Sequence, residues 1–219
     1  MKKALFNNLL VTPEEFHNRA GKNWKSTGAN PICARCLRDV DPYGAFSMKV
    51  TSRFDHEDGI TDCPESSTAS PRYAQLRATD IDPSLGKPFK ADFMKNHSKN
   101  TKKFLSYFIG ASIYNQQLHN AMLDEADRIN IWAYKDIKYW VIPYTLLLLI
   151  DFEGKSSSST FKFQFNLLKT KATPFDSIWL DSNKVKLQKV YVPSGKLVKF
   201  PDGNPYVISE AEFLRITHD

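Results

Sequence analysis

The chain has three cysteines, and all of them lie between positions 33 and 63. Cys33 and Cys36 form a C-x2-C pair, a spacing that lets two thiolates reach one tetrahedral ion. His56 and Cys63 can complete the ligand set in the pattern C-x2-C…H-x6-C. A shared ion would tie together segments that are far apart in the sequence, so this cluster constrains the fold more than any other feature.

Turn-forming residues surround both halves of the cluster, with Pro31 before the first pair, Asp58-Gly59 inside the second half and Pro64 after it. Three free thiols, or a redox-active C-x-x-C pair, are the alternatives. A redox pair is typical of an alternating α/β pattern, which this stretch lacks. We therefore predict a structural Zn²⁺ site, in which four protein ligands leave no open position for catalysis. Because the stretch has few apolar residues, we expect the metal to supply most of its folding free energy.

Three short motifs in this region resemble a known family. Cys33-x-x-Cys36, Ser52 to His56 (SRFDH) and Asp62 to Ser66 (DCPES) are similar to the N-terminal zinc-binding segment of competence protein CoiA and its relatives. The resemblance covers about residues 30–67. It implies a role in DNA processing, because family members continue into a restriction-endonuclease-like domain. The C-terminal half of this chain does not show the pattern of that domain.

Basic residues are concentrated in one stretch. The formal net charge is +6, and the segment from position 87 to 103 contains six lysines but one acid, Asp92. Such a local excess favours contact with a polyanion, DNA or RNA. An ordinary solvated helix face is the alternative. The six lysines are Lys87, Lys90, Lys95, Lys99, Lys102 and Lys103.

We predict an α+β protein in which a small zinc-binding module precedes an antiparallel β-sheet domain with one long helix. The predicted parts are an N-terminal helix and loop (1–27), the zinc module (28–67) and the α+β domain (68–219). Thr12-Pro13-Glu14-Glu15 predicts a helix start with a capping box. Residues 46–51 alternate in polarity as a strand does.

In the larger domain, apolar spacing predicts the long helix at about 101–129. Strands are predicted between about 139 and 208, beginning with the apolar run 139–150. They include Phe161, Phe163 and Phe165, which alternate with polar residues and so indicate one buried and one wet face. Turns are expected at 193–195 and 201–204, and a short helix is expected after Ser209.

One string resembles a nuclease site. Asp151, Glu153 and Lys155 follow an apolar run, and Asp136 is the nearest further acid. Carboxylates of this kind can hold Mg²⁺ for phosphodiester cleavage. The simpler interpretation, which we favour, is a polar hairpin turn between two strands.

The sequence therefore favours a non-enzymatic or weakly enzymatic accessory factor in bacterial DNA or RNA transactions, of the competence or mobile-element defence type. The zinc module and the lysine stretch would contact the nucleic acid. A protein-interaction subunit that docks a larger partner is the alternative, and a Mg²⁺-dependent nuclease is the second. No apolar run reaches the roughly 20 residues of a membrane span, and the N-terminus lacks a signal-peptide pattern, so we expect a cytoplasmic protein.

Overall fold

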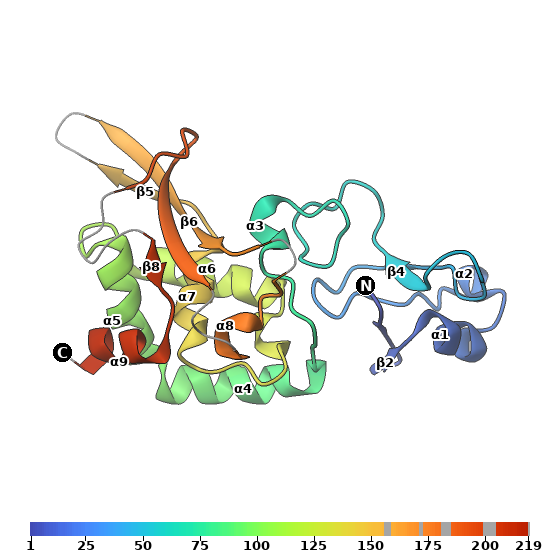
Figure 1. Ribbon diagram of the computed structural model, residues 1–219. Coiled ribbons are helices and arrows are strands. Elements are labelled where there is room, and N and C mark those ends of the chain that lie inside the picture. The colour runs from blue at the N-terminus through green and yellow to red at the C-terminus, as the bar shows by residue number, and fades with distance from the viewer. Residues whose placement is uncertain (156–158, 171–172, 181–184, 199–204, 219) are drawn as a thin grey trace. The chain divides into compact units, whose positions relative to one another are not determined.

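The protein is described from a computed structural model, in which residues 1–155, 159–170, 173–180, 185–198 and 205–218 are placed well enough to describe (Figure 1). The chain divides into two compact units, Met1–Arg77 and Ala78–Asp219. Helices and antiparallel strands both occur, which confirms the predicted α+β class. Among the described residues, no helix has the length and apolar character needed to cross a bilayer.

The N-terminal unit contains little regular structure. Its elements are the pairs β1 (Ala4–Phe6) with β2 (Leu9–Val11) and β3 (Asp41–Tyr43) with β4 (Arg53–Asp55), and the helices α1 (Pro13–Ala20), α2 (Trp24–Thr27) and α3 (Pro71–Ala74). The predicted start of α1 is confirmed. Thr12 accepts a hydrogen bond from the Glu15 amide, and the Glu15 side chain accepts one from the Thr12 amide.

An aromatic cluster forms the core of this unit. Phe16 makes edge contacts with Phe6, Trp24 and Phe54 at ring-centroid distances of 5.0, 5.2 and 6.2 Å. Cys33 and Cys63 belong to the same buried cluster. Residues 1–27, which we predicted as a separate part, therefore supply much of the core on which the cysteines pack. The predicted zinc module has few apolar residues of its own, and the core of the unit also draws on Ala4, Phe6, Val11, Phe16 and Trp24.

The C-terminal unit begins with helices. These are α4 (Pro83–Asn96), α5 (Ser98–Ile109), α6 (Gln116–Arg128), the 3-10 turn η1 (Ile131–Ala133) and α7 (Val141–Leu147), and later α8 (Ser177–Leu180) and α9 (Glu210–His218). α5 packs against α7 and α9, and α4 packs against η1. Phe104 on α5 has no exposed surface and lies 4.7 Å from Tyr144 and 5.5 Å from Phe213, measured between ring centroids.

A four-stranded antiparallel sheet completes the unit. Its order is β5 (Phe152–Lys155), β6 (Thr160–Leu168), β7 (Lys186–Val192) and β8 (Tyr206–Val207). On β6 the buried residues Phe163, Phe165 and Leu167 alternate with more exposed polar ones, as predicted. The β5–β6 hairpin rises away from the helices (Figure 1). A turn predicted at 201–204 lies outside the described residues, whereas the helix predicted after Ser209 is confirmed by α9.

Two predicted elements of this unit are wrong. The single helix predicted at 101–129 is two helices. Gly110 ends α5 with a φ of 102°, and the Asn115 side chain caps the start of α6 by accepting a hydrogen bond from the Leu118 amide. The run 139–150 contains α7 and not a strand. Every residue of α7 is buried, so the run carries no amphipathic period, and periodicity cannot separate a buried helix from a buried strand.

The strand predicted at 46–51 is also wrong. β3 and β4 lie on either side of that segment, which forms the connection between them. Within it, the Ser47 hydroxyl accepts hydrogen bonds from the amides of Lys49 and Val50, both at 3.2 Å. A serine side chain that binds amides two and three residues ahead favours a turn over an extended strand.

Candidate metal centre

The four predicted ligands come together in the N-terminal unit. The sulfurs of Cys33, Cys36 and Cys63 and one ring nitrogen of His56 all lie within 4.8 Å of one another. The Cys33 and Cys63 sulfurs are 3.8 Å apart, and Cys36 Sγ is 3.3 Å from His56 Nε2. A tetrahedral ion with metal–sulfur bonds of about 2.3 Å places two sulfurs about 3.8 Å apart. The spacing is therefore that of one shared ion, and it is too long for a disulfide.

The first pair of ligands sits on a tight backbone turn. The Cys33 amide donates to the Arg38 carbonyl at 2.8 Å, and the Leu37 amide donates to the Cys33 carbonyl at 2.9 Å. The Arg35 amide points at Cys33 Sγ from 3.4 Å. Leu37 closes the turn with a φ of 57°, in the left-handed region that a leucine seldom adopts. The turn thus directs both sulfurs to the same side.

β4 positions the third ligand. His56 follows β4 directly, and β4 is fixed on one side by β3. On the other side the Phe54 amide donates to the Met1 carbonyl, and the Met1 ammonium donates to the Phe54 carbonyl, both at 2.8 Å. His56 Nδ1 is buried and has no hydrogen-bond partner among the described residues.

Cys63 opens a second turn. The Ser66 amide donates to the Cys63 carbonyl at 3.1 Å. The guanidinium of Arg77 then donates to the carbonyls of Pro64 and Ser66, at 2.9 and 2.7 Å. These bonds satisfy backbone groups of a short irregular segment, and they hold Cys63 at the edge of the core.

An ion pair links the two halves of the ligand set. Arg38 lies two residues after Cys36, and Asp62 lies directly before Cys63. The Arg38 guanidinium binds both carboxylate oxygens of Asp62, with Nη2 at 2.7 Å from Oδ2. The paired fork geometry adds orientation as well as energy. Both side chains keep more than a third of their surface exposed, so the pair is worth about 1 kcal/mol or less.

The titratable groups of the centre perturb one another. Hydrogen bonds from Cys33 and Cys63 lower the pKa of the Cys36 thiol, and hydrogen bonds to Cys36 and Cys63 raise the pKa of Cys33. Burial opposes the charged form of His56, but hydrogen bonds to Cys36 and Cys63 outweigh it and raise its pKa to about 9. Without metal the site thus favours a thiolate beside an imidazolium, and a metal must displace protons to bind.

Soft donors dominate this site. Three sulfurs and one imidazole nitrogen suit zinc or iron and are poor ligands for magnesium or calcium. Four protein donors would fill the coordination sphere of a tetrahedral ion, which is the arrangement of structural sites. Asp55 binds Arg53, with Nε at 2.8 Å from Oδ2, and Glu57 is exposed. Neither belongs to the ligand group. The donor set therefore fits a metal that cross-links the unit.

The six predicted nucleic-acid-binding lysines lie on two consecutive helices. Lys87, Lys90 and Lys95 are on α4, and Lys99, Lys102 and Lys103 are on α5. On α5 the three lysines follow the spacing of one helix face, opposite the buried Phe104. Three of the six have partners, because Lys90 pairs with Asp127 at 2.5 Å, Lys102 binds Gln116 and Lys103 binds the Thr217 carbonyl.

The four nuclease candidates do not assemble into a metal site. In the described part of the chain, Cys33, Cys36, His56 and Cys63 form the one group of three or more potential ligands. Glu153 and Lys155 lie on β5, where Glu153 is opposite Lys162 of β6. Asp136 lines a pocket beside α4 instead. The polar turn that we favoured for this string is also wrong, because Phe152–Lys155 form strand β5 itself and pair antiparallel with β6.

Two features of the structure were not predicted from the sequence. One is the Arg38–Asp62 ion pair. Each of its residues lies close to a candidate ligand in the sequence, and this position could have indicated the pair. The other is the pocket beside α4, whose only sequence signal is the density of aromatic residues from Trp132 to Tyr139.

No protein-family model, no curated protein and no solved structure matches the chain.

Proposed function

We propose that the N-terminal unit is a structural zinc-binding module, in a cytoplasmic accessory protein that binds DNA or RNA. The observation that carries the zinc assignment is the convergence of three sulfurs and one nitrogen within 4.8 Å. Zinc is the usual ion in closed tetrahedral sites of this donor type. All three cysteines are free of disulfides, which accords with a reducing compartment.

Exposed lysines support contact with a polyanion. Lys87, Lys95 and Lys99 extend from α4 and α5 into solvent. Lysines held on helices present a fixed row of positive charge, and phosphate contacts of this kind supply affinity without sequence choice. The bacterial competence or defence setting that the zinc motifs suggest belongs to the same proposal.

The zinc module has a surface of its own for this role. The segment between β3 and β4 presents Phe46 and Met48, which are 73% and 104% exposed. Lys49 lies between Met48 and Val50, and there is no acidic residue from Tyr43 to Phe54. Aromatic rings beside basic residues suit unpaired bases of a single strand. His56 directly follows β4, so a metal bound there would fix the base of this segment.

Salt dependence tests the nucleic-acid proposal. We expect the protein to bind single-stranded oligonucleotides, with affinity that falls steeply as salt rises because bound phosphates release counterions. Reversing Lys95, Lys99, Lys102 and Lys103 to Glu should abolish binding. The matched control reverses four other exposed lysines, which are Lys155, Lys162 and Lys186 of the sheet and Lys196 after β7, and so makes the same change in net charge. Equal loss in both variants, or binding indifferent to salt, would contradict the proposal.

Docking of a protein partner is the second candidate. The observation that favours it is the same exposed segment, since a fully exposed methionine beside a phenylalanine is typical of adaptable protein-binding surfaces. Under this alternative, Met48→Ser together with Phe46→Ser abolishes capture of the partner, and the four lysine reversals leave it unchanged. The lysine reversals thus separate the two proposals, because they abolish nucleic-acid binding under the first and leave capture of the partner unchanged under the second.

A further inference from the structure

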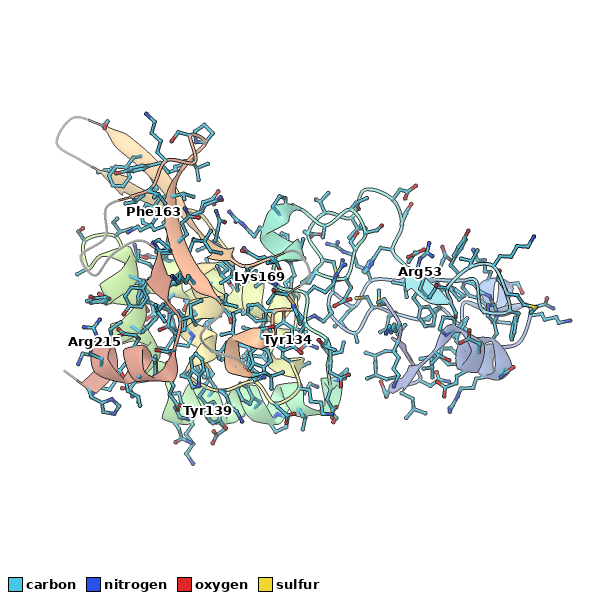
Figure 2. All side chains as sticks on the ribbon, in the orientation of Figure 1. Arg53, Tyr134, Tyr139, Phe163, Lys169 and Arg215 are labelled. Atoms are coloured by element: carbon cyan, nitrogen blue, oxygen red, sulfur yellow. The ribbon has the colours of Figure 1, made fainter. Side chains whose placement is uncertain are left out.

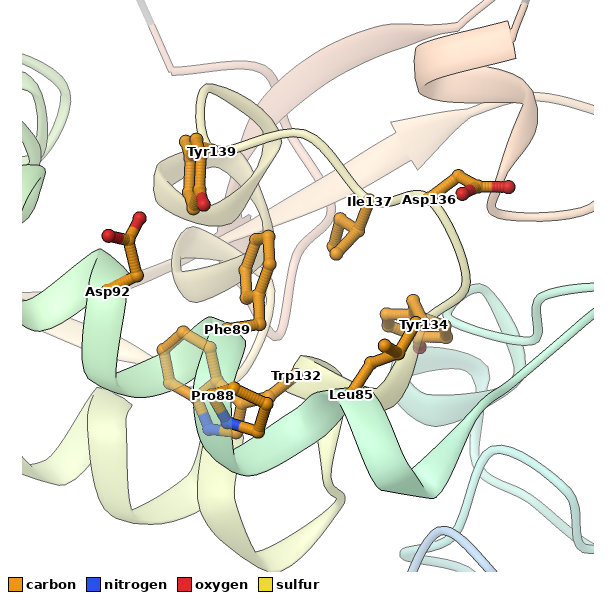
Figure 3. A pocket seen from close by; sticks show the side chains of 9 residues that line it. All are labelled: Leu85, Pro88, Phe89, Asp92, Trp132, Tyr134, Asp136, Ile137 and Tyr139. Carbon is orange, nitrogen blue, oxygen red and sulfur yellow. The ribbon is translucent and has the colours of Figure 1, made fainter.

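A pocket of about 340 Å³ lies in the C-terminal unit, between α4 and the segment 131–139 (Figure 3). Small-ligand sites range from roughly 300 to 1,000 Å³. Besides aliphatic side chains, its lining contains four aromatic residues and two acids, which are Phe89, Trp132, Tyr134, Tyr139, Asp92 and Asp136. Among the described residues, no basic side chain belongs to this lining. The pocket is therefore aromatic and negatively charged, and a cation is complementary to it.

One aromatic face of the pocket is available to a ligand. Phe89 is parallel to Tyr139, with ring centroids 4.8 Å apart and planes 13° apart. Tyr139 is also parallel to His97, at 4.0 Å and 15°, so both faces of the tyrosine are covered. In the part of the chain that the structure describes, Tyr139 is the one ring that packs on Phe89. The second face of Phe89 is therefore left to the pocket, and a cation within about 6 Å of such a ring is attracted to it.

Two carboxylates supply the negative charge. The hydrogen bond from Tyr139 lowers the pKa of Asp92, so this group is ionised at neutral pH. The Asn96 side-chain amide also donates to Asp92 Oδ1, at 2.7 Å. Asp136 stands at the other end of the pocket (Figure 3). Neither acid has a salt-bridge partner among the residues that the structure describes, so a bound cation would be their counter-charge.

Nearby lysines do not neutralise the pocket. Lys90 and Lys135 are paired with acids outside the lining, at N–O distances of 2.5 and 3.7 Å. Lys87 leaves α4 on the face opposite Phe89, because two residues along an α-helix turn the direction of the side chain by about 200°. Lys138 is exposed and does not belong to the lining. The two carboxylates therefore keep their attraction for a cation from outside.

The backbone holds the two walls of the pocket close together. The Asp82 amide donates to the Ala133 carbonyl at 2.7 Å. At Gly86 a Cβ atom would lie 3.2 Å from Asn130 Oδ1 and 3.6 Å from the Ala133 nitrogen, so glycine permits the approach of α4 to η1. The walls are thus fixed by the fold, which reduces the ordering that a ligand must impose when it binds.

We propose that this pocket binds a methylated ammonium group, with the cation against the free face of Phe89 and between the carboxylates of Asp92 and Asp136. Methyl groups suit the apolar and aromatic lining, whereas the N–H groups of a primary ammonium would lose hydrogen bonds to water there. A free quaternary ammonium compound and a trimethylated lysine side chain share this chemistry. The site is independent of the proposed nucleic-acid binding.

A matched pair of probes tests the role of the charge. The pair consists of choline and its neutral isostere, in which a carbon atom replaces the charged nitrogen. Each is titrated into the full chain while the Trp132 indole proton is followed by NMR, since this ring lines the pocket and its Nε1–H donates to Asp127 at 2.7 Å. We expect choline to bind about tenfold more tightly than the isostere. Equal affinities would overturn the inference, because the pocket would then recognise apolar shape alone.

Substitutions assign the effect to the pocket. Asp92→Asn keeps an acceptor for Tyr139 but removes the charge, so it should weaken choline binding about threefold and leave the isostere unchanged. Asp124→Asn, exposed on α6 outside the pocket, makes the same change in net charge and should have no effect. Phe89→Leu should reduce the preference for choline about fivefold, whereas Phe89→Tyr keeps the ring and should preserve it. Equal weakening by Asp92→Asn and Asp124→Asn would contradict the proposed site. The Trp132 resonance of each free variant shows whether the pocket wall remains folded.

Further probes test the class of ligand. Methylammonium that binds more tightly than tetramethylammonium would overturn the preference for a methylated cation, and dimethyl phosphate that binds more tightly than either would identify an anion site instead. A short peptide that contains trimethyllysine distinguishes the two sources of the group. Tighter binding of this peptide than of choline supports the site as one for a modified protein partner, and equal binding supports it as one for a free small molecule.

Discussion

The two units of this protein reach a folded state by different means. In the N-terminal unit the longest helix, α1, has eight residues and the strands have three each, and two of the four candidate ligands lie in the core itself. In the C-terminal unit, helices of up to fourteen residues and a four-stranded sheet enclose a larger aromatic core (Figure 2). Figure 2 draws the side chains of both units on the ribbon, with Phe163 on β6 and Tyr134 after η1 labelled in the larger one.

The difference indicates where each unit takes its stability. Short elements bury little surface, so a small domain generally needs a metal or disulfides to remain folded. The larger unit can rely on apolar burial alone. A metal in the first unit and packing in the second should therefore make the units respond independently to the variants below.

The largest effect is expected from Cys63→Ser. Serine is a poor zinc ligand, and metal binding contributes on the order of 10 kcal/mol in small zinc domains. We expect loss of bound zinc and unfolding of residues 1–77, while residues 78–219 stay folded. Zinc analysis and residue-resolved hydrogen exchange measure the two effects. Glu57→Gln, beside a ligand but outside the ligand group, is the control and should keep the metal.

Phe104→Ala should destabilise the C-terminal unit and leave the N-terminal unit and its metal unaffected. Phe104 is fully buried and lies 4.6 Å from Phe108 between ring centroids. Removing such a ring costs about 3–5 kcal/mol. Thermal denaturation should show the C-terminal unit melting earlier, with zinc content unchanged. Metal loss in this variant would show that the two units are not independent.

A smaller effect is expected from Lys189→Met on β7. Burial lowers the pKa of Lys189 to about 8 from 10.5. Between these values the unfolded chain binds more protons, so the free energy of unfolding rises with pH across that window. Methionine removes this dependence and should stabilise the unit at pH 7 by about 1–2 kcal/mol, after allowance for partial exposure. Contacts of the ammonium with the Phe108 carbonyl at 3.1 Å and the Phe163 ring at 4.1 Å oppose the gain.

Denaturant titrations at pH 7 and pH 10.5 measure this effect. Lys186→Met on the same strand is the control, since Lys186 is exposed and should alter neither value. A larger pH dependence in Lys189→Met than in the parent protein would contradict the assigned direction.

Leu37→Gly should give the smallest change, and it should be stabilising. A left-handed conformation costs a residue with a side chain about 1–2 kcal/mol, and the greater freedom of unfolded glycine offsets about 0.5–1 kcal/mol of the gain. The Leu37 side chain is 61% exposed, so its loss removes little packing. In competition with a zinc chelator, the Leu37→Gly variant should retain its zinc slightly more tightly than the parent protein. Leu37→Ala keeps the backbone penalty and should show no gain.

How far the sequence predicted the structure also differs between the units. The ligands Cys33, Cys36, His56 and Cys63 were recognisable because spacing and turn residues are local signals. The core around Phe16 was not, because its members come from segments on both sides of the cysteine pair. In the larger unit, the alternation of apolar and polar residues identified β6. The uniformly buried α7 has no amphipathic periodicity from which its helical structure could be predicted. The pocket forms where α4 approaches η1 at Gly86. This is a tertiary contact, and local sequence patterns do not indicate it.

Hydrogen exchange of the parent protein before and after removal of its metal by a chelator tests the central claim most directly. We predict one zinc per chain before treatment. After treatment, amides of residues 1–77, including those of Cys33 and Phe54 in the turn and in β4, should lose protection, while amides of β6 and α5 keep theirs. A protein that contains no metal as purified and still protects the amides of the N-terminal unit would contradict the account.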